Sequence, residues 1–363
     1  MYGVILLAAG CTRTPPEAVP ASAPTPGTAA ARLAAELDGL SLDDFFDASF
    51  RALTLRSPET VVEAGLTNIY GVTNVALDDI SDAYVQETYA LTAVILDALE
   101  SYDRAALSPE QQISYDVYRW YLQDRLAGQP FHQYEYPATY FQSTAVHESL
   151  RLFFTDIHPV RSLQDARDYV ARLRLVDAKI EQLIAELDAR AAAGLTPPAF
   201  AVDWAFYSSL HGLIRAGATA TPFYTNLATK VAALPDASAA EKEALLADAE
   251  TAVETAVLPA YQKLYDYLRD MPVYTGAASG VWRLPDGDAY YAYRLRHYTT
   301  TDLTADEIHA LGLAELDRIH GAMRAVFDEL GYPADESLVQ LFDRVARDGG
   351  HVAGAEVLAT YEA

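Results

Sequence analysis

A segment in the last quarter of the sequence concentrates side chains that could do chemistry. Residues 290–316 read YYAYRLRHYTTTDLTADEIHALGLAEL. Phenol and guanidinium groups can stack on the apolar parts of a ligand and hydrogen-bond with its polar parts, and imidazole is a common metal ligand. The segment therefore predicts a metal site, a wall of a substrate site, or ordinary packing of aromatic side chains.

The spacing of the histidines argues against a metal site. A His-Glu-x-x-His motif places two imidazoles one helical turn apart, but Arg151 stands where His147-Glu148 would need its second histidine. His309 and His320 fall on one helix face but are separated by about 16 Å along the axis. The chain has one cysteine, so a thiolate zinc site is excluded. We expect no metal site in this chain, and we interpret His147-Glu148 as a salt-bridged or solvated pair.

Other catalytic patterns are missing as well. No Gly-x-Ser-x-Gly elbow occurs, and no glycine-rich run precedes a lysine as it would in a phosphate-binding loop. The acidic segment LDDISDAY lacks the central glycine of a calcium loop. The sequence therefore contains no complete catalytic set.

The tyrosine-rich segment carries the strongest β signal in the chain. Asp286-Gly287 is a favoured tight-turn pair, and tyrosines alternate after it, so residues 281–298 are predicted to form a β-hairpin. In a strand over 291–298, alternate side chains lie on opposite faces. One face would carry Tyr291, Tyr293, Leu295 and His297, and the other Ala292, Arg294, Arg296 and Tyr298.

Two interpretations of this ribbon remain open. In the first, Tyr291, Tyr293, Arg294 and His297 contact substrate, and Thr300 in the threonine run adds a hydroxyl group beside them. In the second, the tyrosines form a cross-strand ladder packed on helices, which the 24 tyrosines of the chain also favour. The types of the side chains do not decide between the two.

Glu315 is unusual in the helix that follows the ribbon. On a helical projection it falls within the apolar stripe formed by Leu311, Ile319, Met323, Val326 and Leu330. Burying a carboxylate is costly unless a cation or donor pairs with it. We therefore expect Glu315 either to pair with Arg294 or Arg296 near the substrate, or to be hydrated in a wet cleft.

Helices must position these groups, because helix signals dominate the rest of the chain. Ser108 and Gln111 have capping-box spacing with a proline between them, and Thr304 and Glu307 have the same spacing. Thr221-Pro222 predicts another helix start. One long helix is expected over residues 162–194, and a second, over 238–271, is expected to kink at Pro259. The predicted fold class is all-α, with mainly long antiparallel helices and the small hairpin.

Composition excludes some classes of partner. The 363 residues are 51% hydrophobic and carry a net charge of -25. Nucleic acid is not expected as a partner, because it requires a basic surface. No apolar stretch is long enough for a membrane-spanning helix. The substrate is instead expected to be a peptide or a small molecule, and the sequence does not indicate an oligomeric state.

The amino-terminal residues resemble a bacterial lipoprotein signal. A short apolar run, MYGVILLAAGC, ends in small residues before Cys11, the predicted site of lipid attachment. The proline-rich residues 12–31 are predicted to be a disordered tether, and residues 32–363 a helical domain that is incomplete at its carboxyl end. The predicted location is the cell envelope, with the outer membrane favoured and a lipid anchor as the sole membrane contact.

Several segments together resemble a known family. LSPEQQISYDV, the DARDYVARL…AGLTPP segment, VLPAYQKLYDYL and, most specifically, GVWRLPDGDAYYAYRLRHYTTTDLTADEIHALGLAEL are similar to the bacterial lipoprotein family called domain of unknown function 885. The resemblance extends from near residue 40 to the end. It implies a mostly helical fold similar to one half of a zinc-peptidase-like cleft.

The resemblance also implies a function. The family's presumed metal centre, a His-Glu element followed by Pro-Gly-His and Glu-Gly-Trp, is not found in these 363 residues. We therefore expect the chain to be the amino-terminal part of a metal-dependent, peptidase-like hydrolase, supplying a cleft wall for a peptide substrate and inactive by itself. Zinc would belong to a full-length protein. The alternative is a non-catalytic lipoprotein that binds peptides or envelope partners.

Overall fold

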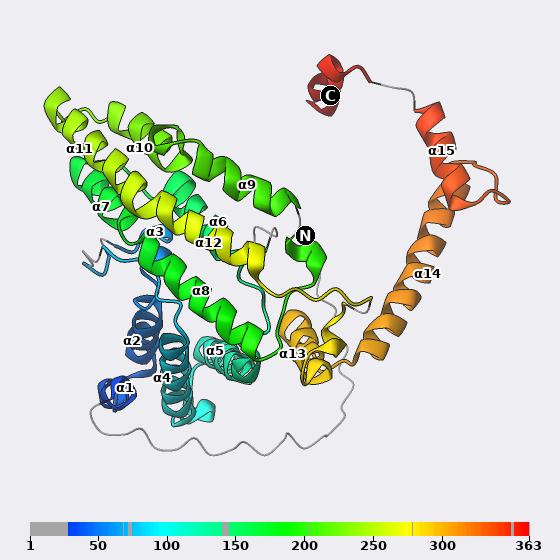
Figure 1. The fold of residues 1–363 in the computed structure, drawn as a ribbon. Helices are drawn as coiled ribbons and strands as arrows, with labels where there is room; N and C mark the ends of the chain where they lie inside the picture. Colours follow the sequence, from blue (N-terminus) through cyan, green and yellow to red (C-terminus); the bar gives the residue numbers. More distant parts are fainter. Residues whose placement is uncertain are drawn as a thin grey trace. The chain divides into compact units, whose positions relative to one another are not determined.

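The chain folds as helices in two compact units. The computed structural model describes residues 28–67, 69–71, 75–139, 145–202, 204–277, 279–349 and 352–362. In these residues the protein is all-α, as predicted, and no strand forms beyond an isolated bridge between Pro198 and Tyr274. The first unit runs to Pro285 and the second begins at Asp286 (Figure 1).

A small helical cluster opens the first unit. Phe45, Ile95, Leu99 and Leu122 are fully buried at its centre. The Phe45 ring also lies 5.5 Å from that of Tyr102. The helices of this cluster are α1 (Ala29–Leu37), α2 (Leu42–Thr54), α4 (Asp82–Glu100) and α5 (Pro109–Ala127), and the short α3 (Pro58–Glu63) follows α2.

A larger helical cluster completes the first unit. Four rings in edge-on contact, of Phe154, Tyr169, Phe223 and Tyr261, lie at its centre. The Tyr169 hydroxyl donates to the Phe223 carbonyl oxygen at 2.8 Å, so its burial leaves no unpaired donor. The helices are α6 (Val146–Leu152), α7 (Leu163–Leu173), α8 (Val176–Ala192), α9 (Trp204–Arg215), α10 (Pro222–Ala232), α11 (Ala239–Ala252) and α12 (Leu258–Asp270).

The predicted helix starts are confirmed. Ser108 accepts a hydrogen bond from the backbone nitrogen of Gln111, whose side chain bonds back to Ser108, and α5 begins between them. Thr304 and Glu307 form the same reciprocal cap on α14 (Ala305–Glu329). The Thr221 hydroxyl caps α10. These starts depend on contacts within one helical turn, which is why local spacing predicts them.

The two long helices of the prediction are both interrupted. The helix expected over residues 162–194 is divided between α7 and α8 at Arg174, and the two parts pack on α11 and α12 respectively. In the other helix, a π-helical turn over Val253–Val257 precedes Pro259. Proline has no N–H to close the α-helical hydrogen bond to Thr255, so the chain deviates one turn earlier than the predicted kink.

The predicted hairpin at 281–298 is wrong, because the second unit begins with a helix. Asp286 takes a left-handed conformation, with φ of 49°, and α13 (Gly287–Thr299) starts directly after it. Val281–Arg283 form a 3-10 turn, in which the Arg283 guanidinium lies 4.3 Å from the Tyr274 ring. Asp tolerates the left-handed region, so Asp286-Gly287 suits a helix entry as well as a hairpin turn.

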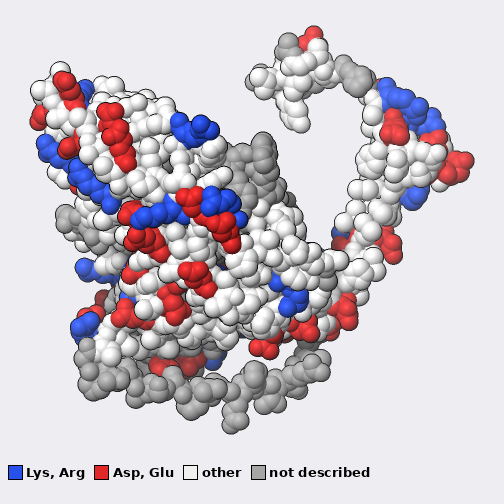
Figure 2. Space-filling model, in the orientation of Figure 1, with Lys and Arg blue, Asp and Glu red and all other residues white. Residues whose placement is uncertain are grey.

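The rest of the second unit buries few apolar side chains. After α13 and α14 come α15 (Leu338–Asp348) and α16 (Val357–Glu362). Phe327 and Leu341 are buried where α14 meets α15, but the predicted apolar stripe of α14 is largely exposed, as at Leu311, Val326 and Leu330. Figure 2 shows uncharged surface along much of this helix.

Candidate functional site

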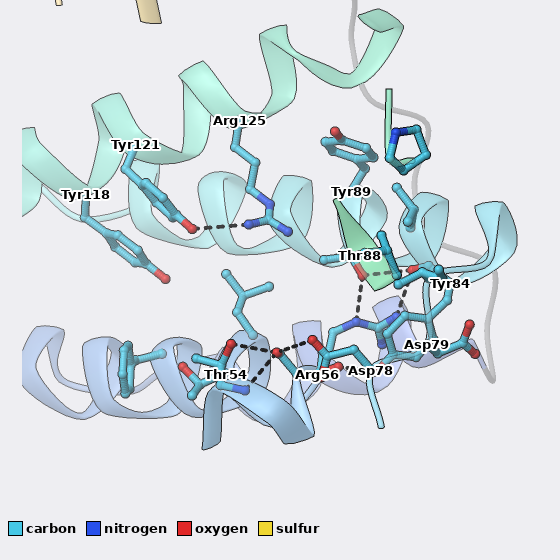
Figure 3. A pocket seen from close by; sticks show the side chains of 18 of the residues that line it. Thr54, Arg56, Asp78, Asp79, Tyr84, Thr88, Tyr89, Tyr118, Tyr121 and Arg125 are labelled. Carbon is cyan, nitrogen blue, oxygen red and sulfur yellow. Dashed lines mark hydrogen bonds between the residues drawn. The ribbon is translucent and has the colours of Figure 1, made fainter. Parts of the chain in front are cut away.

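A cavity of about 1170 Å³ lies between helices of the first unit (Figure 3). Its walls come from α2, α4 and α5, with further residues from the segment after α3 and from α8. Aromatic and aliphatic side chains make up most of the lining, and hydroxyl, carboxylate and guanidinium groups lie among them. The apolar lining includes Phe46, Phe50, Leu53, Ile80, Val85, Ile113, Val117, Tyr118, Tyr121, Pro137, Val146 and Leu183.

Helix α5 has two apolar sides. Tyr115 and Leu122 are buried in the core of the first cluster. Ile113, Val117 and Tyr121 recur at intervals of four residues on another side of the helix and line the cavity. Ile113 and Val117 are 66% and 63% exposed. These side chains have no protein core to fill, so they are available to a ligand.

An aromatic wall joins α2 to α5. The Phe46 ring lies edge-on to that of Tyr118 at 5.7 Å, and Tyr118 stacks on Tyr121 at 6.1 Å. Burial raises the pKa of Tyr118 above its usual value, so the phenol is neutral and donates to Ser49 Oγ at 3.1 Å. The three rings form a continuous, uncharged surface that suits apolar side chains of a ligand.

Arg56 joins two walls of the cavity. Its guanidinium lies 3.7 Å from the Tyr84 ring and donates to Thr88 Oγ1 at 2.8 Å and to Glu87 Oε2 at 2.9 Å. The Tyr84 hydroxyl in turn donates to the Arg56 carbonyl oxygen at 3.0 Å. Arg56 is therefore a structural link from the end of α2 to α4.

A buried network of charges supports the cavity floor. Lys179 on α8 is paired with Glu59 on α3, and both side chains are largely buried. The Asp78 backbone nitrogen donates to Glu59 at 3.0 Å, and Ser57 Oγ donates to Asp78 at 2.7 Å. Burial raises the pKa of Glu59, although Lys179 partly opposes this. The network holds the segment after α3 against α8.

Arg125 differs from the other arginines of the lining. It lies one turn beyond Tyr121 on the cavity side of α5 and donates to the Tyr121 hydroxyl at 3.2 Å. Its Nε is buried and has no hydrogen-bond partner among the described residues. The cavity thus combines an apolar trough with one cation at the end of the α5 stripe.

The structure places four of the predicted substrate residues, Tyr291, Tyr293, Arg294 and His297, on α13 and not on a strand. The face predicted to join Tyr291, Tyr293 and His297 does not form. Side chains four residues apart meet instead: Arg294 lies 4.7 Å from the Tyr298 ring, and the Tyr293 and His297 rings are 5.8 Å apart. Tyr291 is exposed.

Thr300 and Glu315 have other surroundings than predicted. Thr300 ends α13 in a left-handed conformation with φ of 53°, and its backbone nitrogen donates to the Arg296 carbonyl oxygen. Glu315 is 49% exposed and pairs with Arg318 at 2.8 Å. Of the two expected alternatives, burial of Glu315 with Arg294 or Arg296 is therefore wrong, because Arg318 lies one turn away on the same exposed helix and provides the cation. The exposure of Glu315 agrees with the other alternative, a hydrated carboxylate.

His147-Glu148 has the surroundings of a structural pair. Arg151 Nε donates to Glu148 at 2.9 Å, so Glu148 is salt-bridged, which is one of the two states predicted for the pair. His147 is buried, and burial lowers its pKa to about 4. In the part of the chain that the structure describes, no three His, Cys, Asp or Glu side chains lie close enough to hold a metal ion.

The sequence interpretation missed the cavity and concentrated on the later ribbon. The signal of the cavity in the sequence is the four-residue spacing of Ile113, Val117, Tyr121 and Arg125, together with a second apolar side that contains Tyr115. That pattern shows that α5 has two apolar sides. It does not show that α2 and α4 face the second side, because the way in which these helices pack on α5 depends on tertiary contacts.

The fold and the cavity define an all-α protein with a ligand-sized space between helices. The chain belongs to the family described as "Bacterial protein of unknown function (DUF885)", whose pattern matches residues 58–363. This match confirms the family inferred from the sequence.

A solved structure shares the fold. A candidate lipoprotein from Colwellia psychrerythraea is 18% identical and superposes with a TM-score of 0.65. The match covers 84% of this chain and 54% of that chain, so this chain spans about half the length of its structural relative. No curated protein matches the sequence.

Two observations concern the membrane. Cys11 and the greater part of the predicted tether lie outside the described residues, and α1 begins at Ala29. Among the helices that the structure describes, none combines the length and the apolar character that crossing a bilayer requires.

Proposed function

We propose that this chain is the peptide-binding part of an envelope-anchored, peptidase-like hydrolase, and that the cavity between α2, α4 and α5 binds a short apolar peptide. The observation that carries the proposal is the cavity itself. Its volume of about 1170 Å³ exceeds the roughly 300–1,000 Å³ of common small-molecule sites. A peptide of several residues fits such a space better than a single metabolite.

The lining supports a peptide ligand. Phe46, Phe50 and Val117 offer apolar contacts for side chains, while the hydroxyl groups of Thr54 and Ser114 lie among them. A peptide alternates apolar side chains with amide groups that need hydrogen-bond partners when they leave water. A lining of apolar side chains and hydroxyl groups provides contacts for the peptide side chains and hydrogen-bond partners for the amide groups.

The hydrolytic step is not assigned to the described residues. Zinc needs several converging ligands. In the His147-Glu148 pair, the carboxylate of Glu148 already binds the Arg151 guanidinium. The described side chains therefore do not fit zinc. In this proposal a full-length protein holds the metal in other residues, and the present chain supplies binding.

A cavity-filling variant tests the proposal. Val117→Trp places a large side chain in the trough, and it should weaken binding of an N-acetylated alanine-phenylalanine pentapeptide at least about tenfold, a loss of about 1.4 kcal/mol. Val339→Trp is the matched control, because Val339 is 72% exposed on α15 and does not line the cavity. Titration calorimetry measures both. Unchanged affinity in a folded Val117→Trp protein would refute the cavity as the site.

The α13 and α14 residues are proposed as a separate peptide contact. Tyr291, Tyr293, Arg294, His297 and Thr300 present phenol, guanidinium, imidazole and hydroxyl groups within one helix and its cap. Arg294→Ala and Tyr293→Phe should each weaken peptide binding, and Glu315→Gln should alter it through Arg318. Wild-type affinity in the first two variants would remove these residues from the proposed site.

The second candidate function is a non-catalytic lipoprotein that binds peptides or envelope partners. The engagement of Glu148 by Arg151 favours it, because the His-Glu pair then has no open carboxylate. Peptide turnover by the full-length protein, measured with and without a chelator, separates the two. Turnover that the chelator abolishes supports the hydrolase, and binding without turnover supports the second function.

The proposed envelope location rests on Cys11. Lipidation of this residue would hold the protein at a membrane surface. In a cell with two membranes, we propose that this is the outer membrane. Cys11→Ser should move the full chain from the membrane fraction to the soluble fraction. An unchanged distribution would argue against the lipid anchor.

A further inference from the structure

The cavity is lined by three arginines, of which two are satisfied by the protein. Arg56 donates to Thr88, Glu87 and the Tyr84 carbonyl oxygen. Arg190 pairs with Glu186 at 2.8 Å and donates to the Glu135 carbonyl oxygen at 3.2 Å. Both guanidinium groups therefore have an anion and further acceptors. Neither needs a ligand to offset the loss of water around its charge.

Arg125 is the exception in this set. Among the described residues its hydrogen-bond partner is the Tyr121 hydroxyl, at 3.2 Å, and no carboxylate lies within ion-pair distance. Its Nε is removed from solvent without an acceptor. A partly buried cation without a counter-ion is unfavourable, and a ligand anion would correct this.

The position of Arg125 indicates which part of a ligand it would meet. The α5 stripe runs from Ile113 through Val117 and Tyr121 to Arg125, so the cation follows the apolar residues at one end of the trough. In Figure 3, Arg125 reaches from α5 into the space opposite Arg56 and Asp78. A ligand with apolar side chains along the trough would place a terminal group at Arg125.

We propose that Arg125 binds the terminal carboxylate of the peptide, which makes the site selective for peptides with a free carboxyl end. This inference rests on the proposed function of the cavity. The planar guanidinium matches the two oxygens of a carboxylate. The Tyr121 hydroxyl accepts from Arg125 and keeps its own proton for a ligand oxygen.

The lining favours a peptide carboxylate over the carboxylate of a fatty acid. An acyl chain needs apolar contacts alone, whereas Ser114, Thr54 and Asp79 place polar groups on the same walls. Leaving such groups against a hydrocarbon chain would cost hydrogen bonds with water. Dodecanoate therefore serves as the probe that separates the two sources of carboxylate.

The test compares two forms of one peptide. The N-acetylated alanine-phenylalanine pentapeptide, as free acid and as carboxyl-terminal amide, is titrated into the 363-residue chain by calorimetry. The wild type should bind the acid at least about tenfold more tightly, as expected for a charged hydrogen-bonded pair. Arg125→Gln should remove this preference, and Arg125→Lys should restore part of it, because lysine keeps the charge without the planar fork.

The control is Arg119→Gln, which removes one positive charge from the same helix. Arg119 pairs with Glu100 and does not line the cavity, so its variant should keep the preference for the acid. Circular dichroism melts check that each variant is folded.

Three outcomes would overturn the inference, and they are distinguishable. Equal binding of acid and amide by the wild type, with Val117→Trp weakening both, refutes the carboxylate contact and leaves the proposed function standing. Absence of binding by either peptide refutes both. Tight binding of dodecanoate without peptide binding refutes the peptide class. An acid preference that disappears in Arg125→Gln and persists in Arg119→Gln supports the inference.

Discussion

The two units contain similar helices that are stabilised in different ways. In the first unit, Phe154, Tyr169 and Leu264 belong to a contiguous core and are fully or nearly fully buried. In the second, α14 is the longest helix of the described chain, and its apolar residues are largely exposed. Local features hold α14 instead: a capping box and neighbouring pairs such as Glu315 with Arg318.

This difference separates tertiary from local contributions to a helix. Burial of an apolar side chain stabilises by about 1.5–3 kcal/mol, whereas a cap contributes about 1 kcal/mol and an exposed ion pair at most about 1 kcal/mol. Replacing a buried side chain of the first unit should therefore lower the free energy of unfolding much more than the same replacement at an exposed position of the second unit.

The largest difference in stability loss between the two units is expected for two ion pairs. Lys179→Met leaves Glu59 as a buried, unpaired carboxylate and should lower the free energy of unfolding by about 4 kcal/mol. Arg318→Met breaks the exposed pair with Glu315 and should cost about 0.5 kcal/mol or less. Urea unfolding followed by circular dichroism measures both. Equal effects would contradict the difference between the units.

A leucine pair tests apolar packing. Leu264→Ala in α12 removes a fully buried side chain and should cost about 3 kcal/mol, since a cavity is left in the core. Leu313→Ala in α14 removes a side chain that is 53% exposed and should change stability by about 0.5 kcal/mol or less. A large loss for Leu313→Ala would mean that its side of α14 is covered in solution.

Acid should destabilise the first unit through its buried histidines. Burial, with Arg172 beside it, lowers the pKa of His158 to about 4. The unfolded chain binds this proton near pH 6.5, so stability is full above that pH and falls as the pH drops toward 4. The loss from His158 should reach about 2 kcal/mol near pH 4.5.

The matched variant is His158→Gln, which removes the titration. The His158 Nδ1 donates to the Pro159 carbonyl oxygen at 2.9 Å, so the side chain accepts from Arg172 at Nε2. His158→Gln should lower stability at pH 7 and flatten its dependence between pH 6.5 and 4.5. An unchanged slope would show that other groups control the acid response.

The smallest difference in stability loss between the two units is expected at the helix caps. Ser108→Ala and Thr304→Ala each remove the hydroxyl of a capping box and should cost about 1 kcal/mol. In α14 the loss should appear as exchange of the first-turn amide hydrogens about fivefold faster, measured by mass spectrometry. Unchanged exchange in Thr304→Ala would mean that α14 does not depend on its cap.

Much of the fold could be predicted, because helix starts are encoded within one turn. Ser108 with Gln111 and Thr304 with Glu307 specify their helices locally, and the structure has both. The strand predicted in the tyrosine-rich segment is wrong for a related reason: the pattern within the segment fits two kinds of local structure. Tyrosines at 291 and 293 fit a period of two, but Arg294 with Tyr298 and Tyr293 with His297 fit a period of four. No strand partner was identifiable to decide between the two patterns.

The candidate site could not be predicted in the same way. Its walls join Phe46, Tyr84 and Val117 from three helices to Leu183 from α8, and these contacts depend on tertiary packing. The sequence shows that Val117 and Tyr121 share a side of α5, but not what that side faces. The unsatisfied state of Arg125 is also a tertiary property, since it depends on which carboxylates α5 meets.

The π-helical turn at Val253–Val257 has a consequence for related sequences. The backbone nitrogen of Leu258 reaches back five residues to the Val253 carbonyl oxygen, so the turn accommodates one residue more than an α-helix would. A relative lacking one residue here could continue as a plain α-helix and keep its later side chains on the same sides of the helix. A one-residue deletion elsewhere in α11 or α12 would instead displace all later side chains by about 100° around the axis. One-residue gaps in family alignments should therefore occur in this turn and not in α11 or α12.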